Sequence, residues 1–333
     1  MSRNSIDHLS ERAQRAYMRN VALDALSHYK LEDARVTLIN AGFNYSYRID
    51  TADGEKYALR VNVNSRRSLE NLRAEVSWVE ELGTSTSLWV ARPQMNRDKE
   101  LITFAGVDRD NSFAAVLYSW LPGSDLNKAP SPERWYAVGA AMATLHKHSR
   151  DWSLPSAASV PRLDSVTWGA EDRLHGGLVS APADDLAMLR DTWDQCASVL
   201  QRLWGHETGQ LIHADLHGWN MKWYRGRLSI FDFDDCGWGL PLQDLTVTSY
   251  YIRDTMEYEE ALLEGYGSVT TLPVHSQEDY EWLVAHRNLL LLNDVVSSVT
   301  KEIQAIVPRY TEATVKKIRL FLETGVYRHT LPS

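Results

Sequence analysis

The period of the hydrophobic pattern changes along this chain, and that change limits the folds open to it. Across residues 35–63 apolar side chains alternate with polar ones, as at Tyr45 and Tyr47, and Asp53-Gly54 is a turn signal between two such runs. The alternation predicts three antiparallel strands. After Leu121-Pro122-Gly123 the apolar residues recur mainly at helical spacing. The sequence therefore predicts an α+β fold with a small β-rich part first and a larger helical part second.

Further segments complete this outline. Helical spacing is expected at residues 10–31, 69–82 (ending at Gly83) and 133–148, and strand-like runs at 100–104 and 113–120. We expect a first lobe over residues 1–117 that includes the leading helix, a linker at 118–122, and a second lobe over 123–333.

Composition excludes several classes of protein. The net charge of −9 disfavours a dedicated nucleic-acid binder. Only two cysteines, Cys196 and Cys236, are present, which excludes a disulfide framework or a cysteine-based zinc site. The longest apolar runs, such as Phe113–Tyr118, are too short for a membrane span, and Met1–Arg19 has no signal-peptide core. We expect a cytoplasmic protein without nucleic-acid or membrane partners; its oligomeric state is not predicted.

The segment from Leu211 to Asp235 carries the chemistry. Strand-like pieces on either side of Arg225-Gly226 predict a hairpin, which brings Asn220 close to Asp232, and Asp215 lies five residues before Asn220. Phosphoryl transfer needs this set of side chains. One aspartate accepts the proton of the attacking hydroxyl, while an amide oxygen and a second carboxylate hold Mg²⁺ on the nucleotide phosphates.

These residues also carry a family resemblance. His213-x-Asp215-x4-Asn220 followed by Ile230-Phe231-Asp232 resembles the aminoglycoside phosphotransferase and choline kinase superfamily, whose members are relatives of protein kinases. The homoserine kinase type II and stress-response kinase branches are the most similar in motif. Gln243-Asp244-Leu245 matches a further family position. The resemblance implies a two-lobed, protein-kinase-like fold in which the first lobe binds nucleotide, with ATP and Mg²⁺ as cofactors.

The resemblance also implies roles for single residues. Asp215 would be the catalytic base, and Asn220 and Asp232 the magnesium ligands. Arg60 stands where the family contacts the nucleotide phosphates, with Glu75 as its ion-pair partner. The family often has lysine at that position, but arginine keeps its charge and can bind phosphate bidentately.

Other positions would surround the nucleotide. Gly42, Asn44 and Ser46 lie in the segment that matches the phosphate-covering loop, which here has a single glycine. Tyr118 and Trp120 lie in the segment that matches the adenine-binding linker.

Several interpretations stay open at this stage. Asp234 and Asp235 are compatible with extra magnesium ligands or with a structural role in the turn, while His213 and Asp244 are expected to support the catalytic loop. Asp215-Leu216-His217-Gly218 also resembles the opening motif of metallophosphoesterases, although the later motifs of that class do not follow.

The acceptor is not determined by any motif. Homoserine, an amino alcohol such as choline, an aminoglycoside or another antibiotic are all compatible with the sequence, as are two alternatives, a catalytically silent nucleotide-binding protein and a Ser/Thr protein kinase. We expect a small cationic or zwitterionic alcohol. Four acidic residues after the hairpin are candidates for attracting it, or else form a solvated helix face: Asp254, Glu257, Glu259 and Glu260.

Overall fold

The structure is a computed structural model that describes residues 6, 9–31, 33–42, 44–63, 67–108, 111–274, 276–298 and 301–331. The chain divides into two compact units. Unit 1 consists of Met1–Gly123, Leu154–Ser159 and Ser229–Asp234, and unit 2 consists of Ser124–Ser153, Val160–Leu228 and Asp235–Ser333. No helix in the described ranges is both long enough and apolar enough to cross a membrane.

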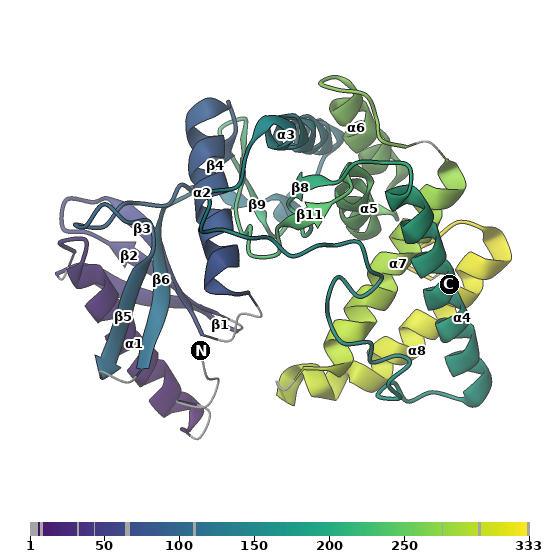
Figure 1. Ribbon diagram of the computed structural model, residues 1–333, viewed down its shortest axis with the longest axis horizontal. Helices are drawn as coiled ribbons and strands as arrows, with labels where there is room; N and C mark the ends of the chain where they lie inside the picture. Colours follow the sequence, from purple (N-terminus) through teal and green to yellow (C-terminus); the bar gives the residue numbers. More distant parts are fainter. Residues whose placement is uncertain are drawn as a thin grey trace. The chain divides into compact units, whose positions relative to one another are not determined.

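Unit 1 is built on an antiparallel sheet with strand order β1-β2-β3-β6-β5 (Figure 1). The three strands predicted within residues 35–63 are confirmed, and the N-terminal position of this sheet confirms the predicted α+β order. The elements of the unit are α1 (Glu11–Ser27), β1 (Arg35–Ala41), β2 (Asn44–Asp50), β3 (Lys56–Asn62), α2 (Leu69–Ser85), β4 (Trp89–Val90), β5 (Thr103–Asp108) and β6 (Asn111–Ser119).

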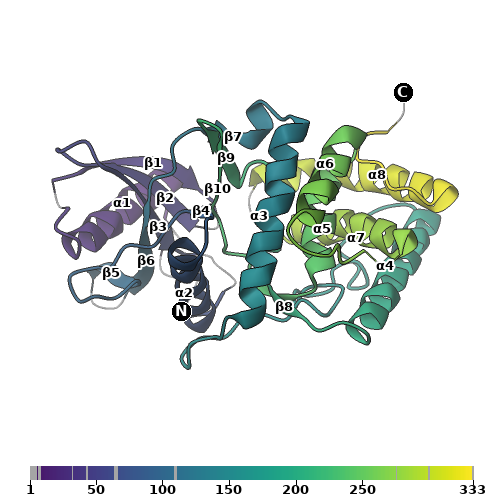
Figure 2. The same cartoon turned by 90° about the horizontal axis from the view of Figure 1, so that it is seen from above.

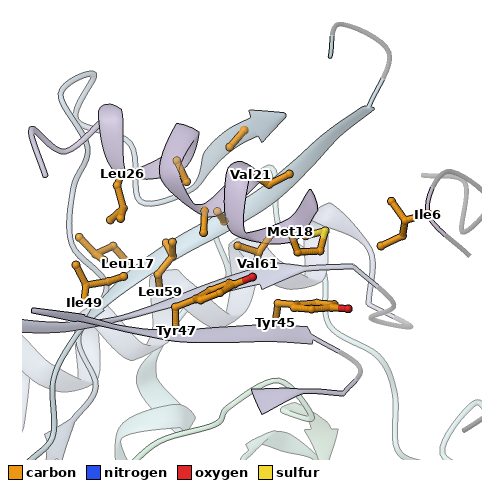
Figure 3. Close-up of a cluster of buried hydrophobic side chains, with 14 residues drawn as sticks. Ile6, Met18, Val21, Leu26, Tyr45, Tyr47, Ile49, Leu59, Val61 and Leu117 are labelled. Carbon is orange, nitrogen blue, oxygen red and sulfur yellow. The ribbon is translucent and has the colours of Figure 1, made fainter. Parts of the chain in front are cut away.

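Helix α1 and the sheet share an apolar core. Alternate residues of β2 are buried, and Tyr45 and Tyr47 lie on the same side of the strand, opposite Met18 and Val21 of α1 (Figure 3). This arrangement follows from the two hydrophobic periods in the sequence. The helix ends at Ser27 and not near residue 31 as predicted, because the chain turns through the left-handed region at Lys30 (φ 61°).

Two other predicted boundaries are wrong. Helix α2 continues past Gly83 to Ser85. A Cβ atom at Gly83 would lie 2.6 Å from two side-chain carbons of Arg92, so this glycine permits close approach of Arg92 and does not end the helix. The strand predicted at 100–104 begins only at Thr103, because the Asn96 side chain accepts hydrogen bonds from backbone N–H groups of residues 98 and 100 and holds a turn there.

Unit 2 is mainly helical. Its elements are β7 (Ser124–Asp125), η1 (Leu126–Lys128), α3 (Pro132–Asp151), α4 (Ala183–Trp204), β8 (Gln210–Ile212), β9 (Met221–Tyr224), β11 (Gly237–Gly239), α5 (Pro241–Ile252), α6 (Met256–Gly267), α7 (Gln277–Val296) and α8 (Lys301–Thr324). Strand β10 (Arg227–Ile230) begins in unit 2 and ends in unit 1.

Helices α3 and α6 lie side by side in both views (Figures 1 and 2). Glycine makes this approach possible. A Cβ atom at Gly139 of α3 would lie 1.9 Å from the carbonyl oxygen of Leu262, and one at Gly265 of α6 would lie 2.0 Å from that of Tyr136. The two helix backbones therefore touch, and α3 brings His146 beside the loop that follows β8.

Candidate active site

The loop between β8 and β9 has a strained backbone that α5 holds in place. Ala214, directly before Asp215, has φ 67°, a conformation that costs a non-glycine residue about 1–2 kcal/mol. Asp244, in the first turn of α5, accepts hydrogen bonds from the backbone N–H groups of His213 (2.9 Å) and Ala214 (2.6 Å). The Nδ1 atom of His213 in turn accepts from the N–H of Asp215 at 3.3 Å. The predicted supporting roles of Asp244 and His213 are confirmed.

Asp244 is fully buried and ionised. Its carboxylate lies 2.9 Å from His146 Nε2, and His146 Nδ1 lies 2.9 Å from the hydroxyl of Tyr266. Burial by itself would raise the pKa of Asp244, but the hydrogen bond and charge of His146, together with His213, outweigh burial and lower it. The loop is therefore anchored by a charged acceptor, which binds backbone N–H groups more strongly than a neutral one.

The structure brings Asp215 and Asn220 together. Asn220 Nδ2 donates to the carbonyl oxygen of Asp215 (3.0 Å) and to its Oδ2 (3.1 Å), and His217 Nε2 lies 3.2 Å from the same Oδ2. Burial would raise the pKa of Asp215, but Arg287 and His217 outweigh burial and lower it. Asp215 is thus an oriented carboxylate that is ionised at neutral pH, as a proton acceptor must be.

Sequence reasoning missed Arg287. This residue of α7 is 72 positions from Asp215, and its Nη2 donates to Asp215 Oδ1 and to the hydroxyl of Tyr251 (3.1 Å). Burial would lower the pKa of Arg287, but Tyr251 and Asp215 together raise it, so the guanidinium stays charged. The sequence feature that could have indicated Arg287 is its position next to apolar residues of the same helix, such as Leu289, which are buried.

The predicted hairpin after Asn220 is present. Strands β9 and β10 flank Arg225 and Gly226, whose φ angles of 48° and 78° are both positive, as a type I′ hairpin turn requires. Asp232 follows β10 and also has a left-handed backbone, with φ 65°. Asn220 belongs to unit 2 and Asp232 to unit 1. Their joint binding of one metal ion therefore stays a prediction.

Within unit 1, the predicted ion pair between Arg60 and Glu75 is confirmed. Arg60 Nη2 lies 2.6 Å from Glu75 Oε2, both residues are buried, and the hydroxyl of Tyr118 donates to Glu75 Oε1 at 3.0 Å. Burial would lower the pKa of Arg60, but Glu75 and the other acidic neighbours raise it. Arg60 of β3 therefore carries a permanent positive charge, and Glu75 of α2 holds its guanidinium in place.

Asp234 takes part in the same polar network. Its Oδ2 accepts a hydrogen bond from Asn44 Nδ2 at 3.3 Å, and its Oδ1 lies 3.9 Å from Arg60 Nη1. The backbone carbonyl of Asp234 accepts from Arg67 Nε at 2.9 Å. These contacts favour the structural interpretation of Asp234, because both of its carboxylate oxygens face cationic or amide groups of the protein.

The other residues predicted to surround a nucleotide also lie in unit 1. Ser46 pairs with Arg60 across β2 and β3, and Gly42 donates its backbone N–H to the carbonyl of Asn44 at 3.2 Å. Residue 43, within the predicted loop, lies outside the described residues. Trp120 follows directly after β6 and is half-buried.

The acidic residues proposed to attract a cationic acceptor have different surroundings. Glu259 accepts hydrogen bonds from Arg253 and from the hydroxyl of Tyr280, and Asp254 accepts from the backbone N–H of Thr330 at 2.9 Å. The two remaining candidates, Glu257 and Glu260, are exposed. Asp254 and Glu259 are therefore held by protein partners, which favours a structural role for this pair.

Comparisons with known proteins agree with this geometry. The model of the phosphotransferase enzyme family (APH) matches residues 35–282. Amicoumacin kinase of Bacillus subtilis (strain 168) is 24% identical over 234 residues, which cover 70% of this chain and 67% of that protein.

Solved structures share the fold. An amicoumacin kinase in complex with AMP-PNP, Ca²⁺ and Ami superposes with a TM-score of 0.73 at 20% identity, over 93% of this chain and 96% of the other. A microcompartment-associated aminopropanol kinase superposes with a TM-score of 0.75 at 22% identity, over 93% and 99%. The fold of these kinases is therefore the fold of this chain.

Proposed function

This chain is a small-molecule kinase that belongs to the phosphotransferase enzyme family, and we propose that it transfers the γ-phosphoryl group of ATP to a hydroxyl group of an amine-bearing alcohol. The observation that carries the proposal is the oriented, ionised carboxylate of Asp215 beside Asn220 on an anchored loop. The family membership favours this interpretation of the loop over that of a metallophosphoesterase.

In the proposed reaction, Asp215 accepts the proton of the acceptor hydroxyl as its oxygen attacks the γ-phosphorus. A phosphorus–oxygen bond forms, the bond between the γ-phosphorus and the β,γ-bridging oxygen breaks, and ADP leaves. Phosphoryl transfer requires no covalent intermediate with the protein, so positioning and charge neutralisation supply most of the rate enhancement. The rigid loop around Ala214 fits that requirement, since it holds Asp215 in one orientation.

The donor groups of Asn220 and Asp232 are of the chemical type that magnesium prefers. Both side-chain hydrogen bonds of Asn220 use Nδ2, which leaves its amide oxygen available as a ligand, and Asp232 supplies a carboxylate. Among the described residues no group of three or more His, Cys, Asp or Glu side chains is placed to hold a metal. One amide oxygen and one carboxylate are enough protein ligands for Mg²⁺, which usually takes one or two of them and completes its shell with phosphates and water. When bound, the ion neutralises charge on the nucleotide phosphates.

Nucleotide binding is proposed for unit 1. In this proposal Arg60, kept charged by Glu75, binds phosphate oxygens, and Asn44 and Ser46 of β2 assist it. The backbone around Tyr118 and Trp120 would bind adenine. The complex of the similar amicoumacin kinase with AMP-PNP supports ATP as the donor.

The acceptor class rests on the relatives. One of them is named for aminopropanol and others for amicoumacin, and aminopropanol is an amine-bearing alcohol. The proposal is tested by incubating the protein with ATP and Mg²⁺ and one candidate acceptor at a time. The panel contains amino alcohols, hydroxy amino acids, aminoglycosides, neutral sugars and casein.

The readouts are ADP formation and the mass of the phosphorylated product. We expect product with at least one amine-bearing alcohol, and none with Asp215→Asn under the same conditions. Preferred phosphorylation of a neutral sugar contradicts the acceptor class, and preferred phosphorylation of casein favours the protein-kinase alternative. Nucleotide binding without a product from any acceptor would indicate the catalytically silent alternative.

A further inference from the structure

We propose that Arg287 is a positioning residue that orients the Asp215 carboxylate so that Oδ1 is the oxygen that takes the acceptor proton. The inference rests on the proposed role of Asp215 as the base and adds a residue that no catalytic motif contains. All the residues involved belong to unit 2.

The two oxygens of Asp215 are not equivalent. Each carboxylate oxygen can accept about two hydrogen bonds. Oδ2 already has two neighbouring donor groups, Asn220 Nδ2 at 3.1 Å and His217 Nε2 at 3.2 Å. Among the residues that the structure describes, Oδ1 accepts a hydrogen bond from Arg287 Nη2 alone. The remaining acceptor position on Oδ1 is therefore the place where an incoming hydroxyl finds a free lone pair.

Arg287 is held rigidly enough to fix that orientation. The residue is 7% exposed, and its guanidinium carbon lies 5.8 Å from the ring centre of Tyr251 and 6.0 Å from that of Trp168. The Tyr251 ring also contacts the His217 ring edge-on, with centroids 4.9 Å apart. One tyrosine thus contacts the donor groups on both sides of the Asp215 carboxylate, and a small rotation of that carboxylate would break one contact or the other.

A purely structural role explains Arg287 less well. A buried arginine usually has its donors satisfied, because an unpaired buried polar group destabilises the fold. The Nε atom of Arg287 is buried and has no hydrogen-bond partner in the described part of the chain. Its neighbour His286 shows the structural pattern instead, since its Nε2 donates to the carbonyl of Val166 at 2.7 Å. His286 is therefore a matched control on the same helix.

The test is a double-mutant cycle with Arg287→Met and Asp215→Asn, and with His286→Gln as the control. The probe reaction is ATP hydrolysis with Mg²⁺, in which water replaces the acceptor, repeated with 1-amino-2-propanol. Affinity for AMP-PNP and thermal unfolding are measured on every variant. Arg287→Lys and Tyr251→Phe keep the test valid if Arg287→Met does not fold.

We expect Arg287→Met to lower kcat about ten- to hundredfold, the cost of misplacing a reacting group by about 1 Å, while AMP-PNP affinity stays within about threefold. Arg287→Lys should recover part of the rate. In the Asp215→Asn background, Arg287→Met should change kcat less than about twofold, because no carboxylate is left to orient. The effects on kcat of substituting residues that act as a unit are not additive.

Several results would overturn the inference: additive losses in the cycle, an unchanged kcat in Arg287→Met, or equal losses in Arg287→Met and His286→Gln. If Asp215→Asn lowers kcat strongly and Arg287→Met does not change it, the inference about Arg287 is wrong and the proposed function is unaffected. If Asp215→Asn itself keeps kcat within about threefold, the proposed base is wrong and the inference falls with it.

Discussion

Replacing Asp244 by asparagine tests how the loop between β8 and β9 is held. The buried carboxylate accepts hydrogen bonds from the N–H groups of His213 and Ala214 and contacts His146. Asparagine has the same shape but only one acceptor oxygen. In the more favourable of the two amide orientations, the asparagine oxygen takes the place of Oδ2 and keeps the contacts with the His213 N–H and with His146. The amide N–H₂ group then faces the backbone N–H of Ala214.

The expected loss of stability follows from these contacts. Leaving the Ala214 N–H without an acceptor costs about 1–3 kcal/mol, and the remaining bonds lose the strengthening that a charged acceptor provides. We expect the free energy of unfolding to fall by about 2–4 kcal/mol. This loss of unfolding free energy is larger than the backbone strain at Ala214, which is roughly 1–2 kcal/mol. In the unmodified protein the hydrogen bond from the Ala214 N–H to Asp244 offsets that strain. The loop should therefore be held less firmly in its native conformation, and kcat should fall about a hundredfold.

Urea unfolding gives the stability, and initial rates give kcat. The exposed residue Asp191 on α4 provides the control, since Asp191→Asn makes the same chemical change without these contacts. Ala214→Gly in the Asp244→Asn background should recover about 1 kcal/mol, because glycine adopts a positive φ without penalty. A loss below about 1 kcal/mol in Asp244→Asn, or no recovery with Ala214→Gly, would refute the reasoning.

Three further predictions concern the base, the metal and pH. Asp215→Asn should lower kcat about a hundred- to ten-thousand-fold at nearly unchanged AMP-PNP affinity, measured by initial rates and titration; a change within about threefold contradicts it. Asp232→Ala should raise the Mg²⁺ concentration needed for half-maximal rate more than Asn220→Ala, because the carboxylate supplies the charge; an unchanged magnesium titration excludes Asp232 as a ligand. Burial lowers the pKa of His286 from 6.5 to about 4. Its contribution to stability is therefore complete above pH 6.5 and is lost as the pH falls to 4, by up to about 3 kcal/mol. Urea unfolding should show a smaller pH slope in His286→Gln than in the unmodified protein; an unchanged slope contradicts the assignment.

Much of this protein could be predicted from neighbouring residues alone. Alternation of apolar and polar side chains identifies the strands of residues 35–63, and Arg225-Gly226 identifies the hairpin. Asp215 and Asn220 meet because only four loop residues separate them. The pair of Arg60 and Glu75 was predicted from family resemblance and is present. Each of these features depends on short-range chain geometry or on a motif.

Other features were decided only by the tertiary structure. Gly83 looked like the end of a helix, yet its role is to admit the side chain of Arg92. Glu259 looked like part of a free acidic surface, but it is bound by Arg253. Arg287 contacts Asp215, 72 residues away in the sequence, because the buried face of α7 packs toward the loop between β8 and β9. Periodicity tells which face of a helix is buried, but it does not tell which distant side chain that face will meet, because that depends on how closely whole helices pack.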